Sequence, residues 1–427
     1  MQKDLTHLLR DPSLLPSEKR NLLLEIANQA ASMGMPCYVV GGFVRDLLLG
    51  QPINDFDIVV EGDAIKLGKS LVEKYGGKLT LHYKFHTAVW KMPTTFNVER
   101  STLDLITARS ETYSHPGALP TVTPSTIEED LRRRDFTINA MAIRLDGDHF
   151  GELLDPLNGQ ADLEKKIVRV LHPRSFIDDP TRIFRAIRYE QRYSFALQLS
   201  TLRQAQGSAF NFQPSTFNSL SGERIRHEFD LIFAEKNSAA MLARLDELGV
   251  FEALNLPKFN AGYARLLKSA PPVEFDIAAD EVTAGYLLWV VDSTSSAVEA
   301  LSRRLDFSSA LNQACESIVR LKRDLASLEN SKPSGWTFHL EKFPPLAVYI
   351  SWLVTNEPAL KEFLVNWRHI KPKTTGSDLK ARGLEPGRRY GEILAALRTG
   401  WLDGTIKNDD EEMEMLKRLL QEHPLST

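Results

Sequence analysis

The chain has 427 residues, which is too long for one ordinary hydrophobic core and predicts several sub-domains. With 43% hydrophobic residues and no apolar run as long as a membrane span, the composition predicts no membrane partner. Two cysteines, Cys37 and Cys315, exclude a disulfide framework and indicate a reducing cytoplasm, and the first residues lack a signal-peptide pattern. The net charge of −4 excludes a uniformly basic nucleic-acid binder but leaves room for a local basic surface.

The first part of the chain alternates between helical and strand patterns. An amphipathic helix is predicted over residues 16–34, and further helices over 43–49 and 64–75. Short β-rich runs predict strands at residues 37–40, 57–60, 87–91, 103–107 and 140–145. Residues 109–124 contain four prolines or glycines and few large apolar groups, so we expect a long loop of the kind that carries function.

From about residue 160 the strand patterns fade and helical ones dominate. Helices are predicted at residues 181–191, 238–248, 297–305 and 311–328. Breaks between helices are predicted at residues 325–336 and 369–376, where small and polar residues gather.

Acidic residues on two predicted strands indicate a metal site. Asp55 and Asp57 share one face of a strand because residues i and i+2 point the same way. Asp104 stands on another predicted strand, where an unpaired buried charge is costly. Mg²⁺ held by only a few carboxylates keeps its other coordination positions open for phosphate oxygens and water. We therefore predict Asp55 and Asp57 as metal ligands and Asp104 as a third catalytic acid; the alternative is a polar turn before a strand.

A glycine pair, Gly41-Gly42, follows a predicted strand and opens a helix upstream of these acids. Glycines let backbone N–H groups approach an anion, and the helix N-terminus adds a favourable dipole. Together with the acids, the pair predicts a site for a metal-bound triphosphate. The alternative is a glycine turn needed for packing alone.

Several segments resemble one family. Residues 41–50 (GGFVRDLLLG) and 55–59 (DFDIV) are similar to the head signature of class II tRNA nucleotidyltransferases and bacterial poly(A) polymerases, which belong to the polymerase-β-like superfamily. Residues 129–142 (EDLRRRDFTINAMA) resemble the family's arginine-arginine-aspartate motif. The resemblance implies a ribose contact from Asp135. It also implies nucleotide-binding roles for Gly41, Gly42, Arg45, Arg134 and Asn139.

Residues 175–189 (SFIDDPTRIFRAIRY) resemble the family's amino-acid template, in which protein side chains replace a nucleic-acid template. A carboxylate such as Asp179 can accept from the amino group of cytosine or adenine, and Arg182 can donate to the ring nitrogen beside it. Uracil and guanine present the opposite pattern, which such a site would penalise. Arg185 and Arg188 are predicted to bind the nucleotide too. The usual glutamate before the template aspartate is Asp178 here.

The resemblance implies an α+β head with a polymerase-β-like mixed sheet, followed by an all-helical neck, body and tail. We place the head at residues 1–158, the base-reading neck at 159–235, the body at 236–365 and the tRNA-binding tail at 366–427. The stretches 165–192 and 366–398 each hold eight basic and three acidic residues. Phosphate contacts are therefore expected from both, and in the tail from Lys371, Lys373, Arg388 and Arg389.

The function implied is template-independent addition of C or A nucleotides to the 3′ end of tRNA, from CTP or ATP, with release of pyrophosphate. Whether the product is CCA, CC or the terminal A alone stays open. The resemblance implies that the 109–124 loop influences the switch from C to A addition, and this loop shows no obvious truncation, which favours A addition. The alternatives are a poly(A) polymerase, which differs in product length, and an inactive RNA-binding relative. The intact acids argue against the latter.

Overall fold

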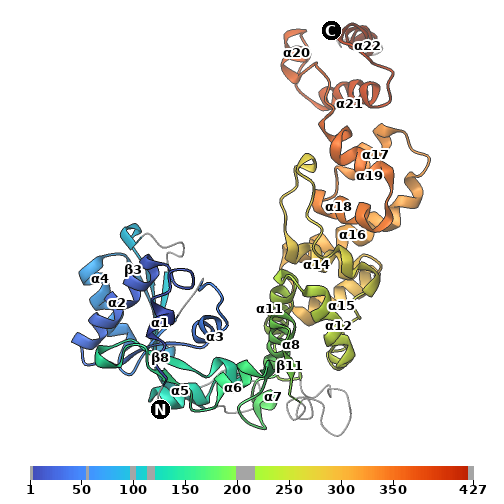
Figure 1. The fold of residues 1–427 in the computed structure, drawn as a ribbon. Helices are drawn as coiled ribbons and strands as arrows, with labels where there is room; N and C mark the ends of the chain where they lie inside the picture. Colours follow the sequence, from blue (N-terminus) through green and yellow to red (C-terminus); the bar gives the residue numbers. More distant parts are fainter. Residues whose placement is uncertain (1–2, 54–56, 97–101, 113–120, 199–216, 422–427) are drawn as a thin grey trace. The chain divides into compact units, whose positions relative to one another are not determined.

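The computed structural model describes residues 3–53, 57–96, 102–112, 121–198 and 217–421 (Figure 1). The chain divides into two compact units, residues 1–220 with 243–257 and residues 221–242 with 258–427. The first unit carries the β-sheet, and the regular secondary structure of the described residues in the second unit is helical. The architecture is therefore a mixed-sheet head with a mostly helical remainder, as expected. The finer boundaries at 158, 235 and 365 stay predictions.

A mixed seven-stranded sheet in the order β3-β4-β5-β2-β1-β8-β9 forms the centre of the first unit. Strands β2 and β5 run parallel to each other, and every other neighbouring pair in this sheet is antiparallel. The strand bounds are β1 Cys37–Val40, β2 Asp57–Val60, β3 Lys78–His82, β4 Thr87–Lys91, β5 Thr102–Thr107, β8 Ala142–Arg144 and β9 Leu153–Leu154.

Side-chain alternation gives the sheet two buried faces. On one face lie α2 (Ser17–Ser32) and α4 (Ala64–Tyr75), which appear side by side in Figure 1. Gly68 of α4 lets Leu105 of β5 approach closely. On the other face, Ile127 and Leu131 of α5 (Ile127–Arg132) pack against Val59 of β2. Residues of β2 that share the side of Val59 therefore face α5.

The first unit also contains short helices and one longer helix, α8. The bounds are α1 Thr6–Leu9, α3 Gly42–Leu48, η1 Tyr83–Phe85, η2 Thr94–Phe96, η3 Thr137–Asn139, η4 Gly147–His149, α6 Gly159–Glu164, α7 Ser175–Asp178, α8 Thr181–Tyr193 and α13 Val250–Ala253. A parallel two-residue pair, β10 (Ile167–Val168) and β11 (Ala196–Leu197), lies among these helices.

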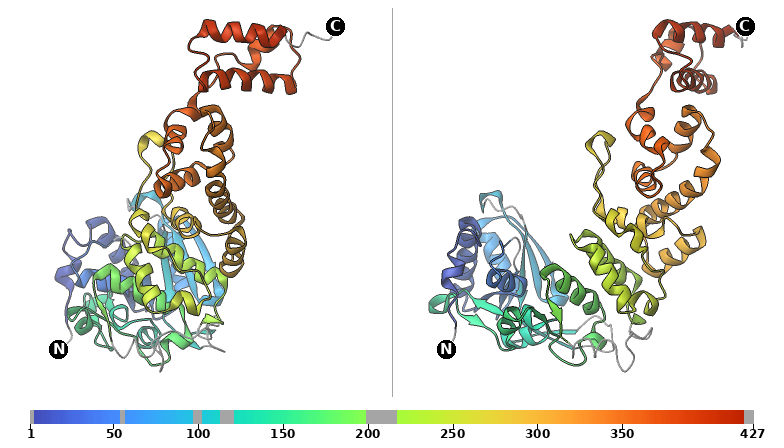
Figure 2. Two further views of the ribbon diagram at one scale, coloured as in Figure 1. Left: turned by 90° about the vertical axis from the view of Figure 1, so that its right-hand side faces the viewer. Right: turned by 45° about the vertical axis from the view of Figure 1, so that its right-hand side comes forward.

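The second unit is a series of helices, shown from two further sides in Figure 2. An aromatic cluster of Phe229, Phe233, Tyr286 and Trp289 packs α11 against α14. None of the described helices is long and apolar enough to cross a membrane. The bounds are α11 Gly222–Ala234, α12 Ser238–Glu247 (shared by both units), η5 Ala261–Leu266, η6 Val273–Phe275, α14 Glu281–Val290, α15 Ser295–Leu305, α16 Ser309–Leu328, α17 Pro333–Leu340, α18 Pro345–Thr355, α19 Pro358–Val365 and η7 Trp367–His369.

The C-terminal helices α20 (Gly376–Ala381), α21 (Arg388–Leu402) and α22 (Asp409–Gln421) enclose a small core of their own. Leu379, Leu397 and Leu416 contribute one fully buried side chain each from these three helices. This core gives the basic tail segment a folded support.

The structure confirms the predicted strands and helices of the first unit, with end shifts of a few residues. It also contains β3, which the sequence analysis did not predict. The long loop predicted at 109–124 is wrong at both ends. There β6 (Arg109–Thr112) and β7 (Thr121–Pro124) form an antiparallel hairpin. Residues 113–120 lie outside the described part of the chain.

Candidate active site

Two of the predicted acids stand on neighbouring parallel strands. Asp57 of β2 and Asp104 of β5 are register partners. Both precede by two residues a side chain, Val59 or Ile106, that packs on the α5 side, so both carboxylates face α5. Burial and then repulsion from the Asp104 carboxylate raise the pKa of Asp57, and Arg134 partly opposes this shift. A divalent cation would relieve this repulsion, so the donor set fits Mg²⁺.

The third predicted acid, Asp55, lies outside the described residues. Within the ranges that the structure describes, no group of three or more His, Cys, Asp or Glu side chains gathers as a metal site. The pair of Asp57 and Asp104 is thus the part of the predicted metal site that the structure brings together.

The glycine turn meets the arginine motif at Gly41. This residue has a φ of +65°, which favours glycine, and joins β1 to α3. A side chain there would also collide, because its Cβ would lie 2.8 Å from Nη1 of Arg134. The Arg134 guanidinium is therefore held against the turn while its charge acts on Asp57. Of the predicted nucleotide-binding residues, Arg134 acts electrostatically on Asp57, and Gly41 lies against Arg134.

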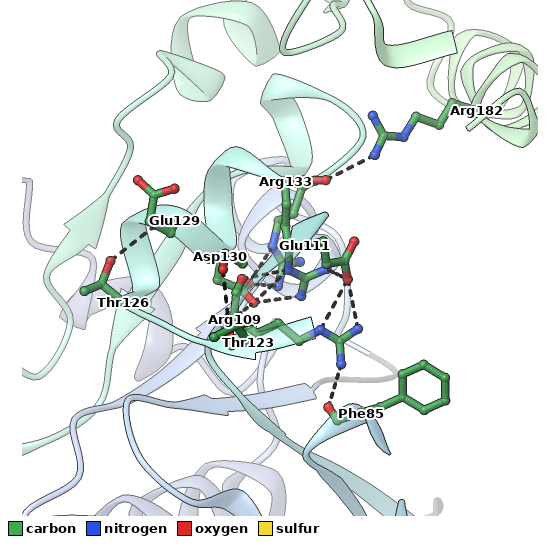
Figure 3. Close-up of polar contacts among 11 residues, drawn as sticks. Phe85, Arg109, Glu111, Thr123, Thr126, Glu129, Asp130, Arg133 and Arg182 are labelled. Atoms are coloured by element: carbon green, nitrogen blue, oxygen red, sulfur yellow. Dashed lines mark hydrogen bonds and ion pairs between the residues drawn. The ribbon is translucent and has the colours of Figure 1, made fainter. Parts of the chain in front are cut away.

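Asp130, which the sequence analysis did not select, organises the arginine motif (Figure 3). Its fully buried carboxylate pairs with Arg134 at 2.8 Å and with Arg133 at 2.7 Å. Burial raises the pKa of Asp130, but the two guanidinium groups outweigh it and hold that pKa below its usual range. Asp130 is therefore an ionised anchor that fixes the direction of both arginines.

Glu111 of β6 ties the hairpin to the same motif. Its Oε1 accepts from Arg133 at 2.9 Å and from Arg109 at 3.1 Å. Figure 3 shows these contacts together with the bond from Arg182 to the Arg133 backbone oxygen. The only sequence signal for Glu111 was an acid inside the predicted functional loop, because its partner Arg133 is 22 residues away along the chain.

The predicted base-reading pair occupies the start of α8. Arg182 is 6% exposed and donates to Ser175 Oγ at 2.9 Å and to the Arg133 backbone oxygen at 3.1 Å. Asp179 precedes the helix, and its Oδ1 accepts from the backbone N–H of Thr181 at 3.1 Å and from that residue's hydroxyl. The aspartate is therefore bonded to Thr181, the first residue of the helix whose second residue is Arg182.

A cavity of about 220 Å³ opens beside Arg182. Arginine and carboxylate side chains from three segments line it, so its wall carries donors and acceptors for a polar ligand. The lining residues are Ser110, Glu111, Glu129, Arg132, Arg133, His172, Asp178 and Arg182.

The remaining predicted nucleotide-binding residues form a continuous set of contacts. Arg45 donates to Asn139 Oδ1 at 2.7 Å, and Asn139 donates to Asp135 Oδ1 at 3.0 Å. Arg185 Nε donates to Asp135 Oδ2 at 2.7 Å. Despite its burial, Asp135 has a pKa below the usual range because Arg185 stabilises the carboxylate. Arg188 lies buried further along α8, and Gly42 opens α3 with Arg45 close to it.

The predicted RNA-binding residues lie in the tail. Lys371, Lys373 and Arg388 are exposed, whereas Arg389 is half-buried. Arg388 pairs with Glu392 one turn along α21 at 2.9 Å. Three of the four predicted side chains are therefore accessible to a polyanion.

The buried Glu412 of α22 holds the backbone beside these lysines. Its carboxylate accepts from the backbone N–H groups of Lys373 at 2.9 Å and Thr374 at 2.6 Å, and from Nε1 of Trp401. The next residue, Thr375, caps α20 in a capping box with Asp378.

Two family models match the chain. A poly(A) polymerase head domain matches residues 37–169, and a probable RNA- and SrmB-binding site of polymerase A matches residues 215–262. An A-adding tRNA nucleotidyltransferase of Halalkalibacterium halodurans is 32% identical, covering 94% of this chain and 93% of that protein. A CC-adding enzyme of Deinococcus radiodurans is 30% identical over 91% of both chains. Against a 31% identical A-adding relative from Geobacter sulfurreducens, the chain spans about half (49%) of the relative's length.

Solved structures agree with these relatives. An apo form of a CCA-adding enzyme has a TM-score of 0.80 at 30% identity, with 98% of this chain and 100% of that chain covered. A Thermotoga maritima CCA-adding enzyme complexed with tRNA has a TM-score of 0.75 at 28% identity, with 99% and 100% covered. Sequence and fold thus agree over almost the whole length, and the chain belongs to the tRNA nucleotidyltransferase family.

Proposed function

We propose that this protein adds nucleotides to the 3′ end of tRNA without a nucleic-acid template, using ATP or CTP. The observation that supports this most directly is the pairing of Asp57 with Asp104 on parallel strands, with the positive charge of Arg134, beside the Gly41 turn, acting on Asp57. This is a carboxylate pair next to a cationic phosphate site. In the reaction, the tRNA 3′-oxygen forms a bond to the α-phosphorus, the bond from that phosphorus to the bridging oxygen of the pyrophosphate breaks, the pyrophosphate leaves, and the hydroxyl proton passes to solvent water.

In this proposal Asp57, Asp104 and Asp55 would hold Mg²⁺, which would supply Lewis acidity to the attacking hydroxyl and to the leaving pyrophosphate. Arg134 binds phosphate oxygens, and Asp130 keeps it aimed at the glycine turn. Arg182 reads the base edge from the cavity that it lines. Lys371, Lys373 and Arg388 bind the tRNA backbone, and a cytoplasmic location stays a prediction.

We further propose that A is the nucleotide added. Three relatives of 31–34% identity are named A-adding enzymes, and this supports A over CC addition. The β6–β7 hairpin supports it too, because the family resemblance assigns the 109–124 segment an influence on A addition. Glu111 connects this hairpin to Arg133, whose backbone accepts from Arg182.

Three tRNA primers test both parts of the proposal: one ending before CCA, one after the first C and one after CC. Each is offered the four NTPs separately. We expect ATP to extend the CC primer by one nucleotide. Incorporation of CTP on the shorter primers would show that the enzyme adds CCA or CC and not A alone. Long A tails would indicate a poly(A) polymerase. Asp57→Asn should be inactive beside a matched control, Asp148→Asn, at an exposed acid of the same unit.

A further inference from the structure

Two tyrosines of α8, Tyr189 and Tyr193, contact a buried arginine of α3. The guanidinium of Arg45 lies over the ring of Tyr189, 5.3 Å from its centroid, and over the ring of Tyr193, 4.8 Å from its centroid. Arg45 is 5% exposed, so these contacts are desolvated. A desolvated cation–π contact is stronger than an exposed one.

Hydrogen bonds close these contacts into a loop between the two helices. Arg45 donates to Asn139, Asn139 to Asp135, and Arg185 to the other oxygen of that carboxylate. Arg185 also donates to the hydroxyl of Tyr189 at 3.3 Å, which returns to the ring under Arg45. We call these five residues, with Tyr193, the α3–α8 network.

Tyr193 adds a second attachment to α3. Its hydroxyl donates to Asp46 Oδ1 at 3.1 Å, and the same carboxylate accepts from Nε of Arg45 at 2.8 Å. Tyr189 is held in turn by the edge of Phe136, with ring centroids 5.6 Å apart. Both rings are thus fixed on several sides, and an arginine seated on them cannot move without moving α8.

The two helices carry the two ends of the proposed nucleotide site. The Gly41 turn begins α3, and Arg182 stands in the first turn of α8. We propose that Tyr189 and Tyr193 are positioning residues that fix α8 against α3 through Arg45. They keep the distance between the base-reading and the phosphate-binding groups constant. This rests on the proposed function. An incorrect base is rejected only while its phosphates are held in register with the base-reading side chains, so a looser α8 lowers discrimination more than it lowers binding.

The test uses single-turnover incorporation of all four NTPs by the full chain on one CC-ended tRNA primer. Tyr189→Leu and Tyr193→Leu should lower the efficiency ratio of the correct NTP to the wrong ones by roughly 10-fold, since the cation–π contact is lost. Tyr189→Phe and Tyr193→Phe keep the rings and should stay within about 3-fold of wild type. Tyr75→Leu is the matched control, because Lys74 lies over that ring at 4.8 Å on α4, away from both helices.

An unchanged ratio in the leucine variants, with all four NTPs slowed equally, would overturn the positioning role. So would an equal loss of discrimination in Tyr75→Leu. If the leucine variants do not fold, Arg45→Lys is tested in their place, because a compact ammonium group cannot contact Asp46, Asn139 and both rings at once. The same loss of discrimination is expected there, and a wild-type ratio overturns the proposal. Wild-type protein that incorporates no nucleotide would instead overturn the proposed function itself.

Discussion

Asp57 and Asp104 stand side by side on the parallel strands β2 and β5, and the fold raises the pKa of Asp57 although Arg134 opposes the shift. Two like charges are held together at a cost to the empty protein. Such a cost is expected where a bound cation or substrate restores the balance. Replacing one of these acids should therefore stabilise the metal-free protein and lower its activity.

Asp57→Asn should reduce nucleotide incorporation by at least about 100-fold, because one proposed metal ligand is lost. Binding of tRNA should change little, since no phosphate contact is removed. Incorporation kinetics and a filter-binding titration check the two halves. Turnover at the wild-type rate would refute the assignment of Asp57.

The same variant should be more stable than wild type at pH 7 in the absence of divalent metal. Because the pKa of Asp57 is raised on folding, its ionised form costs stability above that pKa. The cost disappears as the pH falls below the unfolded value of about 3.9. Thermal unfolding midpoints of both proteins between pH 4 and pH 8 should therefore converge at the acid end, and parallel curves would contradict this.

Asp130→Asn should destabilise the first unit by about 3 kcal/mol, because Arg133 and Arg134 lose a buried anion. The pKa of Asp130 is lowered on folding, so its contribution is present above about pH 4 and is lost as the pH falls through the folded value. Urea unfolding at pH 7 and at low pH measures this. Asp148→Asn is the control, and an equal effect of both substitutions would disprove the anchor.

Arg182→Ala should relax base choice. The arginine favours an unprotonated ring nitrogen and opposes a ring N–H, so UTP and GTP should be rejected less well. The efficiency for the correct nucleotide should fall by roughly 30- to 1000-fold. Arg188→Ala, further along the same helix, should leave base preference unchanged. If Arg182→Ala slows all four NTPs to the same degree, the residue does not read the base.

The double substitution Lys371→Ala with Lys373→Ala should weaken tRNA binding and make its salt dependence shallower by about 1 to 2 in log–log slope. Both side chains are exposed, so folding should be unaffected. Binding titrations at several salt concentrations measure the slope. Arg303→Ala, at an exposed arginine paired with Glu299, should leave it as in wild type.

Local patterns predicted most strands and helices, because alternation and helical periodicity report which face of an element is buried. The same patterns also predicted Asp57 and Asp104 as parts of one site, since both are acids on apolar strands. They missed β3, whose side chains are mostly half-buried or exposed and carry little signal. They could not find the roles of Asp130, Tyr189 or Glu111, because those depend on partners that only the folded chain supplies.

Glu412 fixes the backbone of the tail beside Lys373, which the charges of the tail alone do not explain. The carboxylate holds the backbone at Lys373 and Thr374 by several bonds, and burial does not prevent its pKa from lying below the usual range, because Thr374 and Trp401 donate to it. The backbone that presents Lys373 is ordered before any RNA arrives. The segment therefore loses little conformational entropy when RNA binds. For this reason even a weak contact between Lys373 and a phosphate adds its full interaction energy to the affinity.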